Sequence, residues 1–525
     1  MIKADNNPTG KPLNLCKHNI LKTQFGYESF RPGQEAAIDA LLSGSDVLAV
    51  MPTGAGKSLC YQIPALLLPG MTIVISPLIS LMKDQVNALR ESGCTAAFLN
   101  SSLTSSEYKQ TMNEIRQGRL KLLYIAPERL QRMDFLSETI PMIVIDEAHC
   151  VSQWGHDFRT SYLEIANFIR NINPRPVIAA FTATATQKVK MDIQRLLALQ
   201  NPVSVNTGFD RPNLYFEVQK PGNKKTALLE CLEKRSGASG IVYCSTRKAV
   251  DELYEDLPQY GFSVTRYHAG LDDNQRRKNQ DDFVYDRKQI MIATNAFGMG
   301  IDKSNVNFVI HYNMPKNIES YYQEAGRAGR DGTQADCILL YNGQDVRINE
   351  FLIKQNNEDR EHNPVLLEHN RKLLKLITFY ATGKECLRHR LLSYFGENTS
   401  SFCGNCSNCQ SKKEDQRIYV KLSAEKTPHE KYHEPSAGKP KTTFKDTELM
   451  SAIDKALFEK LKELRKKLAA KENVPAYIVF SDANLRDMCR KKPVSLVQFS
   501  AVNGVGAVKL EKYGEMFIEV ISAAI

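Results

Sequence analysis

The sequence predicts an α/β protein that carries two domains built on parallel sheets, with a helical region after them. Short apolar runs, each suited to a buried strand, alternate with helical segments from residue 47 onward. The pattern resets near residues 206–212, and a second series of apolar runs follows. Beyond residue 342 helical periodicity and a cysteine cluster replace the runs. Because strands that alternate with helices form parallel sheets, the two series indicate two such domains.

The composition indicates a globular protein with several domains. A chain of 525 residues is too long for one core. Apolar residues make up 42% of it, and no apolar run approaches the roughly 20 residues of a membrane span. The polar start has no signal-peptide core, so we expect a cytoplasmic protein with no membrane partner. The net charge of +10 suits a polyanionic partner, although many proteins with such a charge bind none.

The first series begins with an apolar run at 47–50 that leads into a glycine-rich turn at 51–58. Residues 1–20 before it show no convincing element. Further strands are predicted at 72–76, 96–99, 120–126, 142–145 and 177–181.

The turn at 51–58 has the layout of a phosphate-binding loop that holds ATP. A helix is expected to follow from Leu59 until Pro64 bends it. Backbone N–H groups would surround the phosphates, Lys57 would reach the β/γ oxygens, and the Ser58 hydroxyl would bind Mg²⁺. Met51 stands where the strict pattern requires glycine, so a plain turn between core elements is the alternative. The residues assigned to the nucleotide are Thr53, Gly54, Ala55, Gly56, Lys57 and Ser58.

Upstream of this loop, three side chains suit an adenine ring. Tyr27 and Arg31 could sandwich the base while the Gln34 amide reads its edge. A helix N-terminus with a packed tyrosine is the alternative. The nearby phosphate loop favours adenine binding.

Two adjacent acids follow the apolar run 142–145. Asp146 is placed to hold Mg²⁺ through water, and Glu147 to orient and deprotonate the attacking water. A buried run seldom ends in two acids for packing reasons alone. This pair therefore predicts nucleotide hydrolysis.

The only tryptophan of the chain lies just downstream, in the polar segment 152–159. Trp154 and Phe158 beside a nucleotide site could stack on the bases of a single strand, at about 1–3 kcal/mol per base. The alternative, two core residues four apart on a helix, is weakened by Gly155.

The second series predicts strands at 214–218, 240–244, 264–267, 290–293, 308–311 and 337–341, without a phosphate loop. After them come Arg327 and Arg330, separated by small residues. Such arginines suit a domain that delivers a guanidinium to a γ-phosphate held elsewhere, worth roughly 10³–10⁵ in rate. A surface salt-bridge pair is the alternative, and the flanking glycines disfavour it.

Four cysteines suit a metal site. Cys403, Cys406 and Cys409 form a C-x₂-C-x₂-C run, and Cys386 lies upstream on a helix-like stretch. Four thiolates fit tetrahedral Zn²⁺, with an iron–sulfur cluster as the competing interpretation.

Together these segments resemble the RecQ-family DNA helicases of superfamily 2, most closely bacterial ones. The matching stretches are 25–34, 51–58, 76–85, 126–130, 146–150, 153–159, 181–186, 293–302 and 323–332. The resemblance implies two RecA-like motor domains, a zinc-binding helical module and a small all-α HRDC domain. It also implies ATP-driven 3′→5′ translocation on single-stranded DNA, with duplex unwinding in recombination, repair and replication-fork processing.

The resemblance also assigns roles to individual residues. It favours zinc at the four cysteines, makes Arg330 the arginine finger with Arg327 as a supporting γ-phosphate contact, and adds Gln323 to the catalytic set. Tyr477 of the HRDC segment becomes a DNA contact, and Gly504-Val505-Gly506 presents N–H groups to a phosphate or forms a plain turn. The residues that couple DNA binding to hydrolysis are Gln153, Trp154, His156, Phe158 and Arg159.

The expected partners are single-stranded and duplex DNA, a single-stranded-DNA-binding protein and a topoisomerase, with a location near the nucleoid.

Many bacterial relatives place a winged-helix domain after the zinc module, whereas here 410–445 is polar and aperiodic. We therefore predict a flexible linker there, which leaves open how the duplex is split. The predicted units are 1–208, 209–342, 343–411, 412–446 and 447–525.

Two other functions fit parts of the pattern. An RNA helicase or a duplex translocase is disfavoured by the Trp154 segment and by the zinc and HRDC regions. A zinc-containing DNA-binding scaffold with a vestigial motor is disfavoured because Lys57, Asp146, Glu147 and Arg330 are all present.

Overall fold

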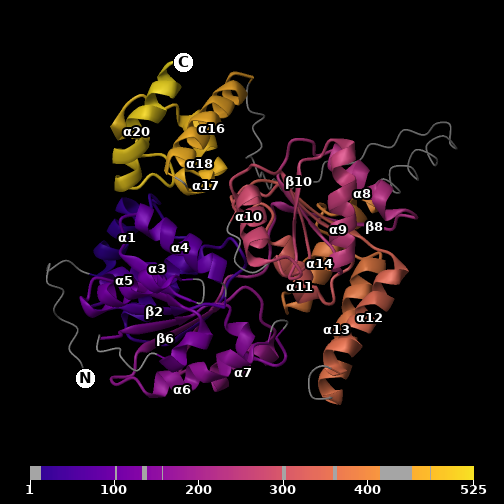
Figure 1. Cartoon of the computed structure of the whole chain (residues 1–525), viewed down its shortest axis with the longest axis horizontal. Helices are drawn as coiled ribbons and strands as arrows, with labels where there is room; N and C mark the ends of the chain where they lie inside the picture. Colours follow the sequence, from indigo (N-terminus) through magenta and orange to yellow (C-terminus); the bar gives the residue numbers. More distant parts are fainter. Residues whose placement is uncertain are drawn as a thin grey trace, which may run out of the picture.

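The computed structural model places two α/β lobes side by side, with a helical hairpin against the second lobe and a C-terminal helical bundle above the first (Figure 1). Among the described residues, no helix combines the length and the apolar character needed to cross a bilayer. The structure describes residues 13–77, 79–100, 103–132, 139–155, 158–297, 303–358, 363–413, 452–472 and 474–524.

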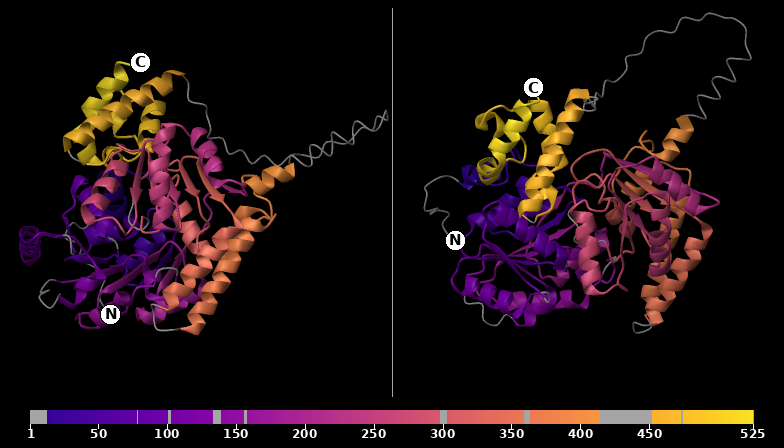
Figure 2. Two further views of the ribbon diagram at one scale, coloured as in Figure 1. Left: turned by 45° about the vertical axis from the view of Figure 1, so that its right-hand side comes forward. Right: turned by 45° about the horizontal axis from the view of Figure 1, so that its top comes forward.

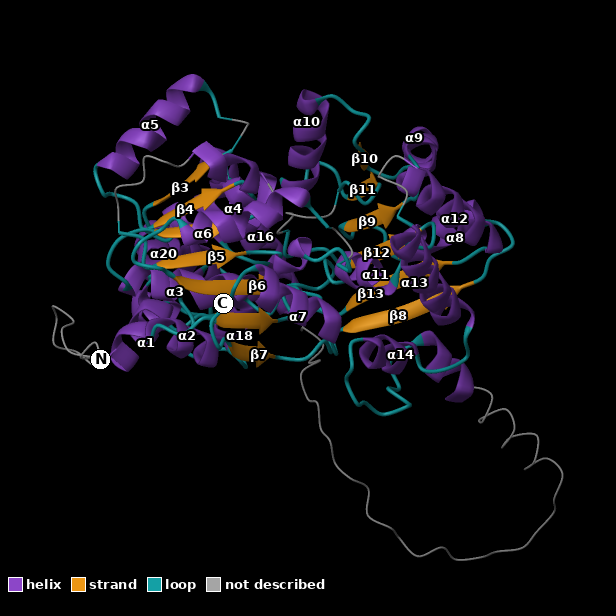
Figure 3. Cartoon of the chain, turned by 90° about the horizontal axis from the view of Figure 1, so that it is seen from below, coloured by secondary structure: helices purple, strands orange, loops and turns teal. Residues whose placement is uncertain are grey.

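The first lobe is a seven-stranded parallel sheet with helices on both faces (Figure 3). Its strand order is β3-β4-β2-β5-β6-β1-β7. Most of these strands are buried along their whole length, as expected where helices cover both faces. The strands are β1 (Val47–Val50), β2 (Thr72–Ile75), β3 (Ala96–Leu99), β4 (Leu122–Ile125), β5 (Met142–Ile145), β6 (Val177–Thr182) and β7 (Val203–Asn206). The helices are α1 (Leu13–Thr23), α2 (Gln34–Leu42), α3 (Lys57–Leu67), α4 (Ile79–Glu91), α5 (Ser105–Arg116), α6 (Glu164–Arg170) and α7 (Gln187–Leu196).

The second lobe repeats the plan with six parallel strands in the order β10-β11-β9-β12-β13-β8. Its strands are β8 (Leu214–Gln219), β9 (Gly240–Tyr243), β10 (Val264–Tyr267), β11 (Ile290–Ala293), β12 (Phe308–His311) and β13 (Ala335–Leu340). Its helices are α8 (Lys224–Glu233), α9 (Arg247–Asp256), α10 (Asp273–Val284) and α11 (Ile318–Ala325).

The cysteine-bearing region is fixed to this second lobe. It consists of α12 (Gly343–Glu358), α13 (Pro364–Thr382) and α14 (Leu387–Tyr394), with the long α12 and α13 side by side in both views of Figure 2. Cys406 forms an isolated parallel bridge with Phe216 of β8. The ring of Tyr380 lies 5.2 Å from that of Tyr321 on α11, and both side chains are buried. The region is therefore packed directly on the second lobe.

The C-terminal bundle has its own core and rests on the first lobe. It contains α16 (Ala452–Glu472), α17 (Ala476–Val479), α18 (Asp482–Lys491), α19 (Leu496–Phe499) and α20 (Ala507–Ser522). The Gly504 N–H donates to the Gly26 carbonyl at 2.7 Å, and Lys512 pairs with Glu91 at 2.8 Å. A longer ion pair of 3.7 Å joins Arg486 to Asp331 of the second lobe.

The structure confirms the α/β class and a strand at every predicted run, but it differs in three places. Residues 13–23 form α1, which sequence reasoning missed because its apolar face is short and packs on α3. The edge strand β7, at 203–206, was also missed because three of its four residues are exposed. The helix after the phosphate loop begins at Lys57 and continues past Pro64 to Leu67.

Of the two alternatives for Gly504-Val505-Gly506, the structure confirms the plain turn, and this turn packs against the first lobe. The Gly504 and Val505 N–H groups both donate to backbone carbonyls, so they present nothing to a phosphate. The predicted linker at 412–446 lies almost wholly outside the described residues. The domain limits given above stay a prediction.

One buried carboxylate ties the start of β1 to its two neighbouring strands. Asp46 is 3% exposed and pairs with both terminal nitrogens of Arg175, at 3.1 and 2.6 Å. It also accepts the N–H groups of Ile178 on β6, at 2.9 Å, and of Gln200 before β7, at 2.7 Å. This one side chain therefore satisfies donors from two separate segments, 175–178 and the turn at Gln200.

We expect Asp46→Ala to lower the free energy of unfolding of the first lobe by about 3–5 kcal/mol, because it leaves buried donors and a guanidinium unpaired. Thermal unfolding followed by circular dichroism checks this. The matched control is Lys248→Ala, which removes an exposed 3.7 Å pair with Glu252 and should cost less than about 1 kcal/mol. Equal unfolding temperatures for the two variants would contradict the role of Asp46.

Candidate functional site: a nucleotide cleft between two lobes

The phosphate loop connects β1 to α3 at the carboxyl edge of the first sheet. Gly54 and Gly56 have φ values of 84° and 82°, which glycine adopts without strain. A Cβ on Gly56 would lie 2.4 Å from the Gln34 amide nitrogen, so this close approach also requires glycine. Lys57 is the first residue of α3, and its ammonium donates to the Met51 carbonyl at 3.2 Å. The loop thus directs N–H groups and a helix N-terminus into one concavity.

The residues assigned to adenine lie at this loop. The Gln34 amide donates to the Gly56 carbonyl at 3.0 Å, and its oxygen accepts the Arg31 N–H at 2.8 Å. The Arg31 guanidinium donates to the Gly54 carbonyl at 2.6 Å. Tyr27, Arg31, Gln34 and Ser58 all line one cavity of about 300 Å³. A base beside the phosphate loop fits this cavity in size and position.

The acid pair follows β5 directly. Burial raises the pKa of Asp146 to about 7, with Glu147 adding to the rise and Lys57 opposing it. A divalent cation favours the charged form of such a carboxylate, so this donor suits Mg²⁺. Glu147 has a φ of 48°, a left-handed conformation that few side chains other than Asn and Asp adopt. Such strain is retained where the direction of a side chain matters.

His149 fixes the direction of Glu147. The His149 Nδ1 atom lies 2.9 Å from the Thr182 hydroxyl and 3.3 Å from a Glu147 carboxylate oxygen. Because the Thr182 hydroxyl donates to the Thr184 carbonyl at 3.1 Å, it accepts from His149, and Nδ1 carries the proton. The buried imidazole therefore gives its Nδ1 proton to the Thr182 hydroxyl and packs beside the carboxylate that is assigned to the attacking water.

The second lobe brings its arginines to this loop. A Cβ on Gly54 would lie 3.6 Å from the Arg330 Cα atom, so the two backbones are in contact. Desolvation lowers the pKa of the Lys57 ammonium. The nearby charges of Glu147 and Asp146 oppose this and raise the pKa, whereas Arg330 lowers it further. Arg327 is 4% exposed and lies against the buried Tyr243. Gln323, on α11, is also buried.

Sequence reasoning missed Arg211, which joins the two lobes. Its guanidinium donates to the Thr53 carbonyl in the phosphate loop at 2.6 Å. It also donates to the Ala328 and Gly329 carbonyls of the second lobe, at 3.0 and 2.8 Å. Its position at 206–212, where the strand pattern resets, was the only signal in the sequence.

The described residues of the tryptophan segment, 152–155 and 158–159, lie in a turn and an irregular stretch and are not helical, as predicted. The Trp154 ring is half-buried, with the Lys188 ammonium 3.1 Å from its centroid. Arg159 donates to the Pro77 carbonyl at 3.0 Å, Gln153 is exposed and Phe158 is half-buried. His156 lies outside the described residues. Tyr477 is in the C-terminal bundle, partly buried against its core.

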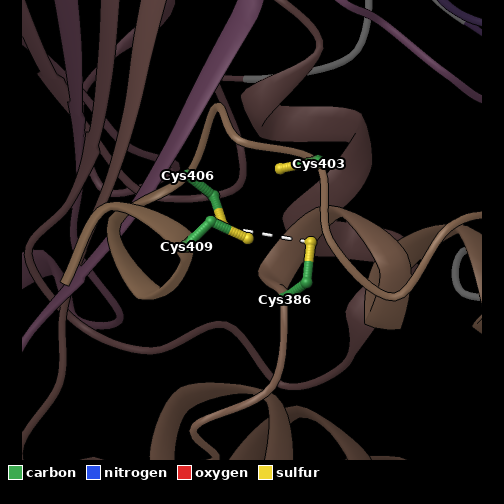
Figure 4. Close-up of side chains that lie close together, drawn as sticks. All are labelled: Cys386, Cys403, Cys406 and Cys409. Atoms are coloured by element: carbon green, nitrogen blue, oxygen red, sulfur yellow. Dashed lines mark hydrogen bonds between the residues drawn. The ribbon is translucent and has the colours of Figure 1, made fainter. Parts of the chain in front are cut away.

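The four cysteines converge in one place (Figure 4). The sulfur atoms of Cys386, Cys403, Cys406 and Cys409 all lie within 4.8 Å of one another. The hydrogen bond with Cys403 lowers the pKa of Cys406, which favours a thiolate there. Four thiols in this arrangement fit a tetrahedral Zn²⁺ that serves the fold, because no ligand position stays open.

Four protein-family models match in the order of these parts. They are "DEAD/DEAH box helicase" at 31–192, "Helicase conserved C-terminal domain" at 223–332, "RecQ zinc-binding" at 343–410 and "HRDC domain" at 454–521. A curated relative from Bacillus subtilis, "ATP-dependent DNA helicase RecQ", is 39% identical and aligns over 96% of this chain and 98% of its own. The chain belongs to the RecQ family. It uses ATP with Mg²⁺, and its cysteine module binds Zn²⁺.

Other relatives support the same membership. The RecQ helicase of Pasteurella multocida is 38% identical over 97% of this chain and 94% of its own. Its alignment covers 600 positions, more than the 525 residues of this chain, so the relative carries residues without a counterpart here. A mimivirus protein named "Putative ATP-dependent RNA helicase R290" is 42% identical over 74% of this chain and 71% of its own.

Among solved structures, yeast Dbp5 bound to RNA and ADP BeF3 has a TM-score of 0.52 and covers 69% of this chain and 97% of its own. The structure of the DEAD-box helicase Mss116 bound to ssRNA and UDP-BeF has a TM-score of 0.51. The match covers 64% of this chain and 74% of the Mss116 chain. Both are 18% identical to this chain, so they support the two RecA-like domains and nothing about substrate.

We expect Cys406→Ser to reduce bound zinc from about one ion per chain to near zero, because a tetrahedral structural site needs all four ligands. Elemental analysis of the purified protein measures this, and the unfolding temperature should fall with it. Cys231→Ser is the control, since this buried thiol lies in the second lobe outside the cluster. A full zinc content in the Cys406 variant would refute the ligand assignment.

Proposed function

We propose that this chain moves 3′→5′ along single-stranded DNA by closing and opening the cleft between its lobes with each ATP hydrolysed, and that it thereby unwinds duplex DNA. The observation that carries the proposal is the approach of Arg330 to the Lys57 loop, with Arg211 bonded to both lobes. Hydrolysis in such a site depends on groups from both lobes, so the state of the nucleotide sets the lobe arrangement.

Each group has a distinct part in this proposal. ATP with Mg²⁺ supplies the phosphoryl group, bound by the loop 53–58 and by Asp146. Glu147 takes the proton of the attacking water, and the buried His149 ring, 3.3 Å from this carboxylate, limits its orientation. Lys57 and Arg330 stabilise negative charge as it develops on the phosphoryl oxygens, and Arg327 with Gln323 supports Arg330. The adenine pocket of Tyr27, Arg31 and Gln34 selects the nucleotide.

The segment with Gln153, Trp154, His156, Phe158 and Arg159 contacts the DNA strand and passes its presence to the acid pair. The physical link is short: a Cβ on Gly155 would lie 2.4 Å from the His149 carbonyl oxygen, so the segment rests directly on the residue that positions Glu147. A base that stacks on Trp154 would therefore shift the backbone beside His149.

The identity of the relatives favours DNA over RNA as the strand. The relatives that align over nearly the whole chain are named DNA helicases, and the one named an RNA helicase covers 74% of this chain. A strand-displacement assay that compares a 3′-tailed DNA duplex with its RNA counterpart and with a 5′-tailed duplex tests substrate and direction together. Preference for the RNA duplex or for the 5′ tail would contradict the proposal.

The remaining proposals concern the setting of this activity. Recombination, repair and replication-fork processing at the nucleoid, with a single-stranded-DNA-binding protein and a topoisomerase as partners, suit an enzyme that exposes single strands. Tyr477 is proposed as an additional DNA contact of the C-terminal bundle.

We expect Lys57→Ala to reduce DNA-stimulated ATP hydrolysis by at least about 10³-fold, because the γ-phosphate loses its cation inside the cleft. DNA binding should stay measurable by fluorescence anisotropy, since Lys57 lies at the nucleotide loop and not at the Trp154 segment. Lys121→Ala, which removes a donor to the Leu68 carbonyl at 2.9 Å outside the cleft, serves as the control. Hydrolysis at the parent rate in the Lys57 variant would refute this site.

A further inference from the structure

One contact joins the tryptophan segment of the first lobe to the zinc-binding region. The Trp154 ring and the His369 ring lie edge to face, with centroids 5.0 Å apart and an interplanar angle of 82°. His369 is on α13, more than two hundred residues downstream in the chain. Figure 1 shows α7, which carries Lys188, on the side of the first lobe that faces the α12–α13 hairpin. The indole is therefore enclosed by one residue from each of two separate bodies.

The tryptophan segment is firmly attached to the first lobe on its other side. The Trp154 backbone N–H donates to the Ser152 hydroxyl at 3.2 Å, and this hydroxyl donates to Asp192 on α7 at 2.7 Å. Lys188, one turn earlier on α7, places its ammonium over the indole face. Gly155 rests on the His149 carbonyl, as described above. The Trp154 position is thus connected to the residue that orients Glu147.

The helix that carries His369 is attached to the arginines of the second lobe. Tyr380, three turns further along α13, packs against Tyr321 on α11, and their hydroxyls lie 3.4 Å apart. The turn with Arg327 and Arg330 follows the C-terminal end of α11. Any rotation of the second lobe relative to the first therefore changes the distance between His369 and Trp154.

The His369 side chain has no other evident task. Its Nε2 atom is buried and has no hydrogen-bond partner among the described residues. Burial lowers the pKa of this imidazole, and Lys188 and Lys372 lower it further, so the ring is neutral at pH 7 and tolerates the ammonium beside it. A buried polar atom without a partner costs stability and is retained where the side chain has another use.

We infer that His369 is a positioning residue which holds Trp154 in a DNA-free position by its edge-to-face contact, and that a DNA base must displace it in order to stack on the indole. The contact and the base compete for one aromatic ring. Lobe closure, which moves α13 with the second lobe, decides which of them occupies it. This inference rests on the proposed DNA role of the Trp154 segment and adds the residue that sets its DNA sensitivity.

The chain reports on this contact directly, because Trp154 is its only tryptophan. In the DNA-free full-length protein, His369→Ala should shift the Trp154 emission to longer wavelengths, since the indole loses its cover. The DNA concentration that half-saturates ATPase stimulation should fall about two- to tenfold, the worth of one aromatic pair, while kcat at saturating DNA stays the same. A 3′-tailed DNA duplex is the ligand in both titrations.

Two further variants separate positioning from folding. His369→Phe keeps an aromatic edge against the indole and should restore both the emission and the half-saturating DNA concentration of the parent. Asn370→Ala, a neutral change at the neighbouring position of α13, should match the parent in both measurements.

Two results would overturn the inference. One is an unchanged emission of the DNA-free His369→Ala protein, and the other is a half-saturating DNA concentration that rises in this variant. The failure of the proposed function has a different signature: the parent chain itself would then show no DNA-stimulated hydrolysis, and its Trp154 emission would not respond to DNA.

Discussion

Arg211 is the interaction on which the rest of the cleft depends. Its guanidinium donates to the carbonyl of Thr53 in the phosphate loop and to carbonyls of the arginine-bearing turn in the second lobe. Backbone carbonyls are fixed by their loops, so a planar cation between them sets the distance between the loops. Burial lowers the pKa of Arg211, yet guanidinium remains charged at physiological pH. The two lobes therefore meet at the phosphate loop through Arg211.

The zinc-binding region and the C-terminal bundle extend this arrangement in opposite directions. The zinc-binding region is fixed to the second lobe through the Phe216–Cys406 bridge and the tyrosine pair between α11 and α13. It reaches back to the first lobe at His369. The C-terminal bundle rests on the first lobe at Gly26 and contacts the second lobe through the pair of Arg486 and Asp331. Each appendage thus belongs to one lobe and contacts the other, so both experience the opening of the cleft.

Much of the motor could be predicted from the sequence because its signals are local. A strand, a turn with two glycines and Lys57 are contiguous, and so are the run 142–145 and the acids after it. The strand β7 and the helix α1 were missed since their burial depends on neighbours distant in the chain and their own apolar patterns are weak. Arg211 and His149 were missed for the same reason: the atoms that define their roles belong to Thr53, Ala328 and Thr182.

The sequence by itself determined the fold class, the phosphate loop, the acid pair and the four metal-binding cysteines, because each follows from residue types at short spacing. Tertiary structure alone decided which parts meet: Arg330 at the phosphate loop, Trp154 between Lys188 and His369, and the turn at Gly504 packed against Gly26. These contacts join segments tens to hundreds of residues apart. Their geometry depends on how whole sheets and helices pack, which no local pattern encodes.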